Sequence, residues 1–119
     1  MLAFRLLLST VVVVVGVYTV PVVVDDGVGA LFPTFFGDIA AVHWPGQFNL
    51  DFFCFLIFSG TWIAWRHRFS AGGIALGIGG VFLGAPYLGI YLLVQASRVG
   101  DDAAVLLLGP ERAAALREG

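Results

Sequence analysis

The side chains that could do chemistry in this sequence are few, and they lie far apart along the chain. A haem held between helices needs two axial ligands at the same depth, usually histidines. The two histidines, His43 and His67, stand on either side of a largely apolar stretch. We therefore expect them on opposite sides of that stretch, where they cannot share a metal within one chain. Each alone could still ligate a chlorophyll-type magnesium.

Asn49 and Asp51 are two polar residues that lie close together at the edge of that stretch. They could serve a proton or a substrate, or cap a helix that begins there. An enzyme acting on lipid or isoprenoid substrates, with Asp51 as its acid, is an alternative. The sequence offers no Ser-His-Asp set, phosphate-binding glycine loop or paired carboxylates, and its single Cys54 excludes an internal disulfide. We predict that the protein is not an enzyme and has no catalytic residues, metal site or cofactor.

The composition is typical of an integral membrane protein. The chain has 119 residues, of which 60% are hydrophobic and only 12% charged, and its mean hydropathy is +0.98. These values lie far from the balance of soluble domains. All six basic side chains are arginines and the net charge is −2, which argues against a nucleic-acid partner because such proteins carry a basic face.

Three apolar stretches predict a single all-α domain, residues 1–119, with three transmembrane helices at about residues 6–24, 48–65 and 72–96. The first has 19 uncharged residues, about 28 Å of helix against a hydrocarbon core of roughly 30 Å. A signal peptide would be shorter and would end in a small-residue cleavage site, which is missing. Its valines would suit a strand in water, but in lipid a helix satisfies the backbone.

The segments outside the three stretches are expected at the membrane surface. Residues 25–47 form an interfacial outer segment between the first two helices, as a lid or as a docking surface for a lipid, pigment or partner. Its apolar residues are Leu31, Phe32, Phe35, Phe36, Ile39 and Trp44. Residues 101–119 predict a short helical tail, with one helix after Asp101 or Asp102 and another from Pro110.

Arginine placement predicts the orientation. Arg5, Arg66 and Arg68 precede the first helix or fill the loop between the second and third, and no acid lies among them. Cytoplasmic loops carry the excess of arginine. We therefore expect a multi-pass protein of the bacterial inner membrane with its N-terminus in the cytoplasm and its C-terminus outside.

Small residues mark one face of the third helix. Gly73, Gly77, Gly80 and Gly84 recur at steps of four, three and four residues. This spacing lets another helix approach closely in lipid. The partner helix could belong to the same three-helix unit or to another subunit.

Two aromatic stripes could contact a ligand or a partner. Phe48, Phe52, Phe55, Trp62 and Trp65 fall broadly along one face of the second helix. They could face lipid and neighbouring helices, or stack on a carotenoid, a quinone or a chlorophyll-type pigment. In the third helix, Pro86 should introduce a bend. Beyond it, Tyr87, Tyr91 and Gln95 follow at four-residue steps and predict a polar-tipped stripe toward the outside.

Part of the chain resembles small bacterial membrane proteins of a domain-of-unknown-function family. The likeness covers residues 48–96 and rests on short blocks within that range: Asp51 to Phe55, Trp62, Ala64-Trp65-Arg66, Leu83-Gly84 and Tyr91 to Gln95. The resemblance implies a bacterial inner membrane and no assigned activity, and it supplies no catalytic residues.

Two functions from different classes fit these observations. The first is a non-catalytic accessory or structural subunit of a larger membrane complex, either energy-converting or pigment-containing. The second is a small transport or channel protein that works as an oligomer, assembled through the glycine face. In both, the partners are the lipid bilayer and other membrane protein subunits. A transporter normally carries a polar or charged group near the bilayer midplane, and none of the three stretches has one.

Overall fold

The computed structural model describes all 119 residues, and every regular element in it is a helix. In chain order the elements are α1 (Leu2–Asp26), the 3₁₀ turn η1 (Val28–Ala30), α2 (Leu31–Ala41), α3 (Trp44–Arg66), α4 (Ala71–Val99), α5 (Ala103–Leu108) and α6 (Pro110–Glu118). By length and composition, α1, α3 and α4 could each cross a membrane. The prediction of an all-helical chain with three long apolar helices is confirmed, which is consistent with a membrane-embedded protein.

The second long helix begins earlier than expected. Its N-cap is His43, with Pro45 in the first turn, where the missing proline N–H leaves no helical bond unmade. Asp51 therefore lies two turns inside α3 and cannot cap it, so that prediction is wrong. Asn49 instead donates to Phe35 O at 3.2 Å and holds α2 against α3.

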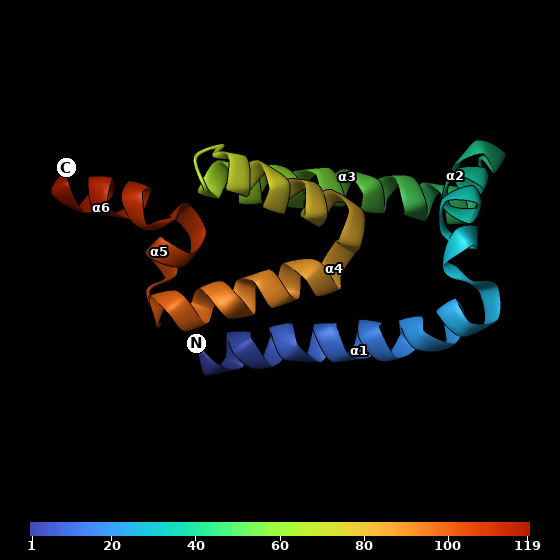
Figure 1. Ribbon diagram of the computed structural model, residues 1–119, viewed down its shortest axis with the longest axis horizontal. Helices are drawn as coiled ribbons and strands as arrows, with labels where there is room; N and C mark the ends of the chain where they lie inside the picture. The colour runs from blue at the N-terminus through green and yellow to red at the C-terminus, as the bar shows by residue number, and fades with distance from the viewer.

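The third long helix is folded back on itself. At Gly84 the backbone has φ 74° and ψ −156°, which interrupts the helix in a region open almost only to glycine. Pro86 follows, and because it has no N–H the carbonyl of Phe82 loses its helical donor. In Figure 1 the yellow first arm of α4 runs beside α3, and the orange second arm returns beside α1.

Contacts between distant residues hold the two arms together. The hydroxyl of Tyr87 donates to Leu76 O at 2.7 Å, although eleven residues separate them. Eleven residues span about 16 Å of straight helix, which is beyond the reach of a tyrosine. At about 1.5 Å per residue each arm is only about 20 Å long, too short to cross a hydrocarbon core of roughly 30 Å alone. Although α4 as a whole is long enough to cross a membrane, its two arms double back at Gly84, a full reversal where the sequence predicts a bend at Pro86.

This reversal puts both termini at one end of the molecule, which we call the arginine end: Met1 to Arg5, residues 66–70 at the end of α3 and in the following loop, and residues 98–119. Asp101 lies 3.9 Å from the N-terminal amino group and from Arg5. The opposite end, called the α2 end, contains η1, α2 and the start of α3 (Figure 1). The sequence predicts the C-terminus on the side opposite the N-terminus, whereas the structure places both termini at the same end, because α4 turns back at Gly84.

Glycines let the first arm of α4 approach α3 closely. A Cβ atom on Gly60 of α3 would lie 2.5 Å from Gly77 O, and one on Gly77 would lie 2.6 Å from Gly60 O. A Cβ on Gly80 would meet Ile63 and Gly60 at 3.1 and 3.3 Å. Gly73 packs on His67, and Gly84 faces Phe52. The glycine face therefore packs inside the unit, against α3.

Candidate functional site

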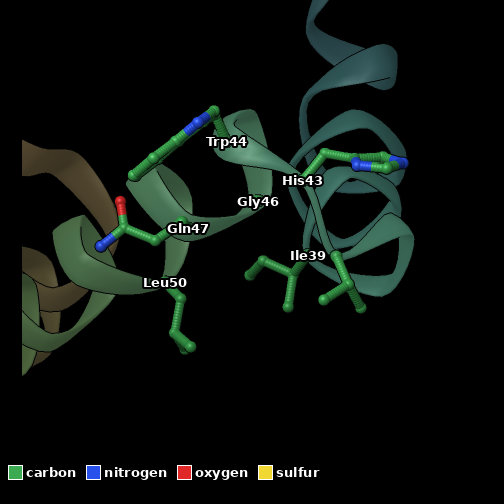
Figure 2. A pocket seen from close by; sticks show the side chains of 7 residues that line it. Ile39, His43, Trp44, Gly46, Gln47 and Leu50 are labelled. Carbon is green, nitrogen blue, oxygen red and sulfur yellow. The ribbon is translucent and has the colours of Figure 1, made fainter.

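A broad hollow lies at the corner between α2 and α3. It measures about 540 Å³ and is lined by Ile39, Val42, His43, Trp44, Gly46, Gln47 and Leu50. Figure 2 shows that His43 and Trp44 point in opposite directions, while Ile39 and Leu50 border the hollow. The polar side chains do not converge, so the hollow offers an apolar surface and no set of groups that could act together on a substrate.

A second groove lies where α3 passes the break in α4. It measures about 380 Å³ and contains Phe52, Phe55 and Trp62 of the predicted aromatic stripe, together with Gly84 and Ser59. The Ser59 hydroxyl oxygen is buried and has no hydrogen-bond partner. The structure therefore brings three residues of the stripe to one apolar groove.

The other two residues of that stripe lie apart from the groove. Phe48 stacks on Trp44 near the α2 end, with ring centroids 5.8 Å apart. Trp65 is covered by Arg112, whose guanidinium lies 4.0 Å from the ring centroid, a cation–π arrangement. The five aromatic residues thus do not form one continuous contact surface.

The tyrosine stripe of α4 does not face outward. Tyr91 is 7% exposed and Gln95 is 9% exposed, and Tyr87 bonds within the hairpin. Because the second arm runs back toward the arginine end, Tyr91 meets the end of α3 there. The prediction of an outward stripe is corrected for this reason.

The most elaborate polar cluster surrounds Arg66, which is only 4% exposed. Its Nε donates to Leu106 O at 2.6 Å, and its two terminal nitrogens donate to Val105 O and to the Tyr91 hydroxyl, both at 3.2 Å. All three acceptors are uncharged. Sequence reasoning treated Arg66 as a surface charge, since its partners lie 25 to 40 residues away.

His67 extends this cluster. Because Arg66 donates to the Tyr91 hydroxyl, that hydroxyl can donate onward to His67 Nε2, 2.7 Å away. His67 Nε2 is then an acceptor, as in neutral imidazole. Burial lowers the pKa of His67, and the neighbouring Arg66 charge lowers it further. The cluster therefore carries one positive charge at neutral pH.

The tail closes over this cluster. Besides the two bonds from Arg66, Trp62 Nε1 donates to Leu107 O at 3.1 Å. Arg112 donates to Trp65 O, and Arg68 pairs with Glu111. The Asp102 side chain accepts from Val105 N at 3.2 Å and caps α5. Helices α5 and α6 are thus fastened to the end of α3.

No three histidine, cysteine, aspartate or glutamate side chains gather where they could hold a metal. His43 and His67 flank the 23 residues of α3, about 34 Å of helix. Comparison of the chain with known protein families, with curated proteins and with solved structures found no match. The resemblance of residues 48–96 to small bacterial membrane proteins therefore stays a prediction.

Proposed function

We propose that this protein is a non-catalytic integral membrane subunit of a larger assembly, held in the bacterial inner membrane with both termini in the cytoplasm. The observation that carries the proposal is the helix break at Gly84. It lies about 20 Å from the arginine end, within the depth of a hydrocarbon core of about 30 Å.

Unpaired backbone groups at that depth must be shielded from lipid. Backbone without helical hydrogen bonds is tolerated in a bilayer only where protein buries it or where it lines a water-filled cavity. Phe82 and Leu83, beside the break, are 62% and 63% exposed. The chain itself therefore leaves the tip of the hairpin open, and a neighbouring protein would supply the cover.

The side chains that line the hairpin tip at Gly84 favour burial by a neighbouring protein rather than exposure to water. The groove beside Gly84 presents mainly aromatic and aliphatic side chains, with a single serine hydroxyl. Water occupies a cavity stably when it finds two to four polar partners there. The glycine face, which could have joined copies into a channel, already packs on α3. Both features support a subunit whose uncovered surface contacts other chains.

The proposed orientation follows from the arginines. All six arginines, Arg5, Arg66, Arg68, Arg98, Arg112 and Arg117, belong to the arginine end, together with the four acids of the tail. The α2 end has Asp25, Asp26 and Asp38 and no arginine. By the positive-inside rule the arginine end faces the cytoplasm. The reversal of α4 strengthens this asymmetry, because a straight helix would place Arg98 and the tail outside.

Single cysteines test the topology. In a Cys54→Ser background, Asp26→Cys should react with an impermeant thiol reagent in intact cells. Ser97→Cys and Glu118→Cys should react only after permeabilisation. If Ser97→Cys and Glu118→Cys instead reacted like Asp26→Cys, α4 would cross the membrane and the folded-back arrangement would be wrong.

Purification in a mild detergent, followed by mass analysis, tests the subunit role. We expect foreign membrane subunits to co-purify with the wild-type chain. Leu83→Ser, at the uncovered tip, should reduce their yield severalfold. Ile78→Ser is the matched control, because Ile78 is also about half exposed but lies on the first arm away from the tip. A homogeneous oligomer without foreign chains would contradict the proposal.

The alternative, an oligomeric transport or channel protein, is favoured by the half-helices of α4, since such interrupted helices line the ion and substrate sites of many transporters. Ala85, exposed beside the break, discriminates the two functions. With Ala85→Cys in the same background, reaction with a small water-soluble thiol reagent would show water at the tip and favour a channel. A subunit with a dry, covered tip should leave that cysteine unreactive.

A further inference from the structure

A small cavity at the arginine end is bordered by an excess of positive charge. It measures about 130 Å³, and its charged lining consists of Arg66, Arg68, Arg112 and Glu111, with His67 beside them. Three guanidinium groups and one carboxylate give a net charge of +2 while His67 is neutral. The cavity lies at the end of α3, between the α3–α4 loop and the first turn of α6.

Nothing in the chain offsets this charge fully. Arg66 is buried and bonds only to two backbone carbonyls and a tyrosine hydroxyl. Charged groups that are buried are usually paired, because an uncompensated charge is costly to remove from water. Glu111 is the only carboxylate at the cavity, and it pairs with Arg68. An additional anion would therefore be favoured here.

The side chains at the cavity mouth suit a phosphate group. Arg68 and Glu111 are 64% and 66% exposed, and an ion pair at such a site contributes only about 0–1 kcal/mol, so Arg68 can turn to another anion. Arg112 is held in place by Trp65, beneath its guanidinium plane. Guanidinium forks match the oxygens of phosphate and bind them in pairs.

The size of the cavity and its surroundings indicate whether the phosphate would be free or part of a lipid. A volume of about 130 Å³ equals that of roughly four waters at about 30 Å³ each, which admits a headgroup phosphate but no acyl chain. Phe69, Leu107 and Leu116 are 54%, 54% and 70% exposed on the neighbouring loop and tail. They are exposed apolar side chains on the loop and the tail helices that border the cavity, as a lipid requires and a free phosphate does not.

We propose that this cavity binds a phosphate group carried by an anionic phospholipid of the surrounding leaflet. Basic pockets beside transmembrane helices on the cytoplasmic side bind such headgroups in other membrane proteins. The bound lipid would bridge the end of α3 and the first turn of α6, and so fasten the tail to the membrane surface.

Thermal unfolding of the full chain in a nonionic detergent tests the site. Ligands that bind only the folded state raise the unfolding temperature by mass action. Phosphatidylglycerol should raise it with a saturable dose, whereas phosphatidylcholine should not, because its choline cation would meet the arginines. A comparable rise with inorganic phosphate alone, and none with phosphatidylglycerol, would overturn the lipid assignment.

Variants of the charged residues test whether phosphatidylglycerol binds at this cavity. Arg68→Gln and Arg112→Gln should each weaken phosphatidylglycerol binding about tenfold or more. Arg68 is exposed, so its variant should fold, and glutamine at position 112 keeps a donor for Trp65 O. Arg98→Gln removes the same charge at the same end and should bind like the wild type. Glu111→Gln removes the cavity's one carboxylate and should tighten binding severalfold, which a purely structural role would not produce. If all four variants bound phosphatidylglycerol as tightly as the wild type, the proposal would be overturned.

Discussion

The two ends of the molecule differ in how completely the chain covers itself. At the arginine end, Arg66, Tyr91, Leu106 and Ala113 are buried together, and side chains of α3 hydrogen-bond to the tail. At the α2 end, helix α2 is apolar yet has no buried residue, and Trp44 is 71% exposed. Self-contained packing is thus concentrated at one end, and the other end is left for lipid or partners.

The reversal of α4 explains this difference. Because α4 turns back at Gly84, its first arm packs on α3 and its second arm returns beside α1 toward the arginine end, while α1, α2 and α3 reach the α2 end (Figure 1). Fewer elements leave more apolar side chains without a neighbour. The contacts that stabilise the fold are therefore concentrated at the arginine end, and equivalent substitutions should lower the free energy of unfolding more at that end than at the α2 end.

The largest loss is expected from Gly77→Leu, at the contact between α4 and α3. Overpacking in a close-packed interior costs about 1–3 kcal/mol. We expect the upper part of this range, because a Cβ at Gly77 would lie 2.6 Å from Gly60 O and backbone cannot move aside as a side chain can. Thermal unfolding in detergent measures the loss.

Gly72→Leu is the matched control for this prediction. Gly72 lies in the first turn of the same helix, and a Cβ there would meet nothing within 4 Å. If Gly77→Leu unfolded at the same temperature as Gly72→Leu, the close approach of the two helices would be disproved.

A smaller loss is expected from Arg66→Met, which keeps much of the apolar stem but removes three hydrogen bonds. Leaving buried polar groups without partners costs about 1–3 kcal/mol each, although part of the cost of burying the charge is recovered at the same time. We expect a net loss of about 2 kcal/mol and release of α5 and α6. Limited trypsin digestion should then cut at Arg112 and Arg117 faster than in the wild type.

Arg98→Met provides the comparison, since Arg98 is exposed and lies at the same end. It should leave tail digestion unchanged. Equal digestion of the wild type and Arg66→Met would mean that Arg66 does not hold the tail.

At the α2 end, Asn49→Ala should cost less. Its amide donates to Phe35 O at 3.2 Å and approaches Asp38 Oδ2 at 3.4 Å, and a bond of this kind contributes about 0.5–1.5 kcal/mol. The expected loss is about 1 kcal/mol, read from the same unfolding measurement. A loss larger than that of Arg66→Met would reverse the comparison between the two ends.

The smallest effect concerns pH and His67, which is only half-buried. Burial and the Arg66 charge depress its pKa in the folded state, below the unfolded value of about 6.5. The unfolded chain therefore binds the proton more readily, and stability rises with pH where that is so. The stabilisation is complete above pH 6.5 and is lost as the pH falls through the folded pKa.

The loss of stability as the pH falls below about 6.5 should disappear in His67→Gln and persist in His43→Gln, since His43 is exposed at the other end. Unfolding temperatures measured across this range provide the test. An unchanged slope in His67→Gln would show that another group titrates there.

The sequence by itself determined the all-helical class, the three apolar helices and the glycine spacing of α4. These follow from local properties: hydropathy counts apolar residues along the chain, and helix geometry places residues three and four apart on one face. The tail helices begin where Asp102 and Pro110 predict them, for equally local reasons.

Only the tertiary structure decided the direction of the second arm of α4, and with it the side of the C-terminus and the burial of Arg66. Pro86 predicted a bend, but a bend has no fixed angle, and the break at Gly84 was not predicted. The angle is set by distant contacts: Tyr87 with Leu76, Tyr91 with Arg66, and Arg5 with Ala96. Since those partners lie 11, 25 and 91 residues apart, no local pattern could specify them, and hydropathy is the same whether an apolar helix crosses a bilayer or turns back within it.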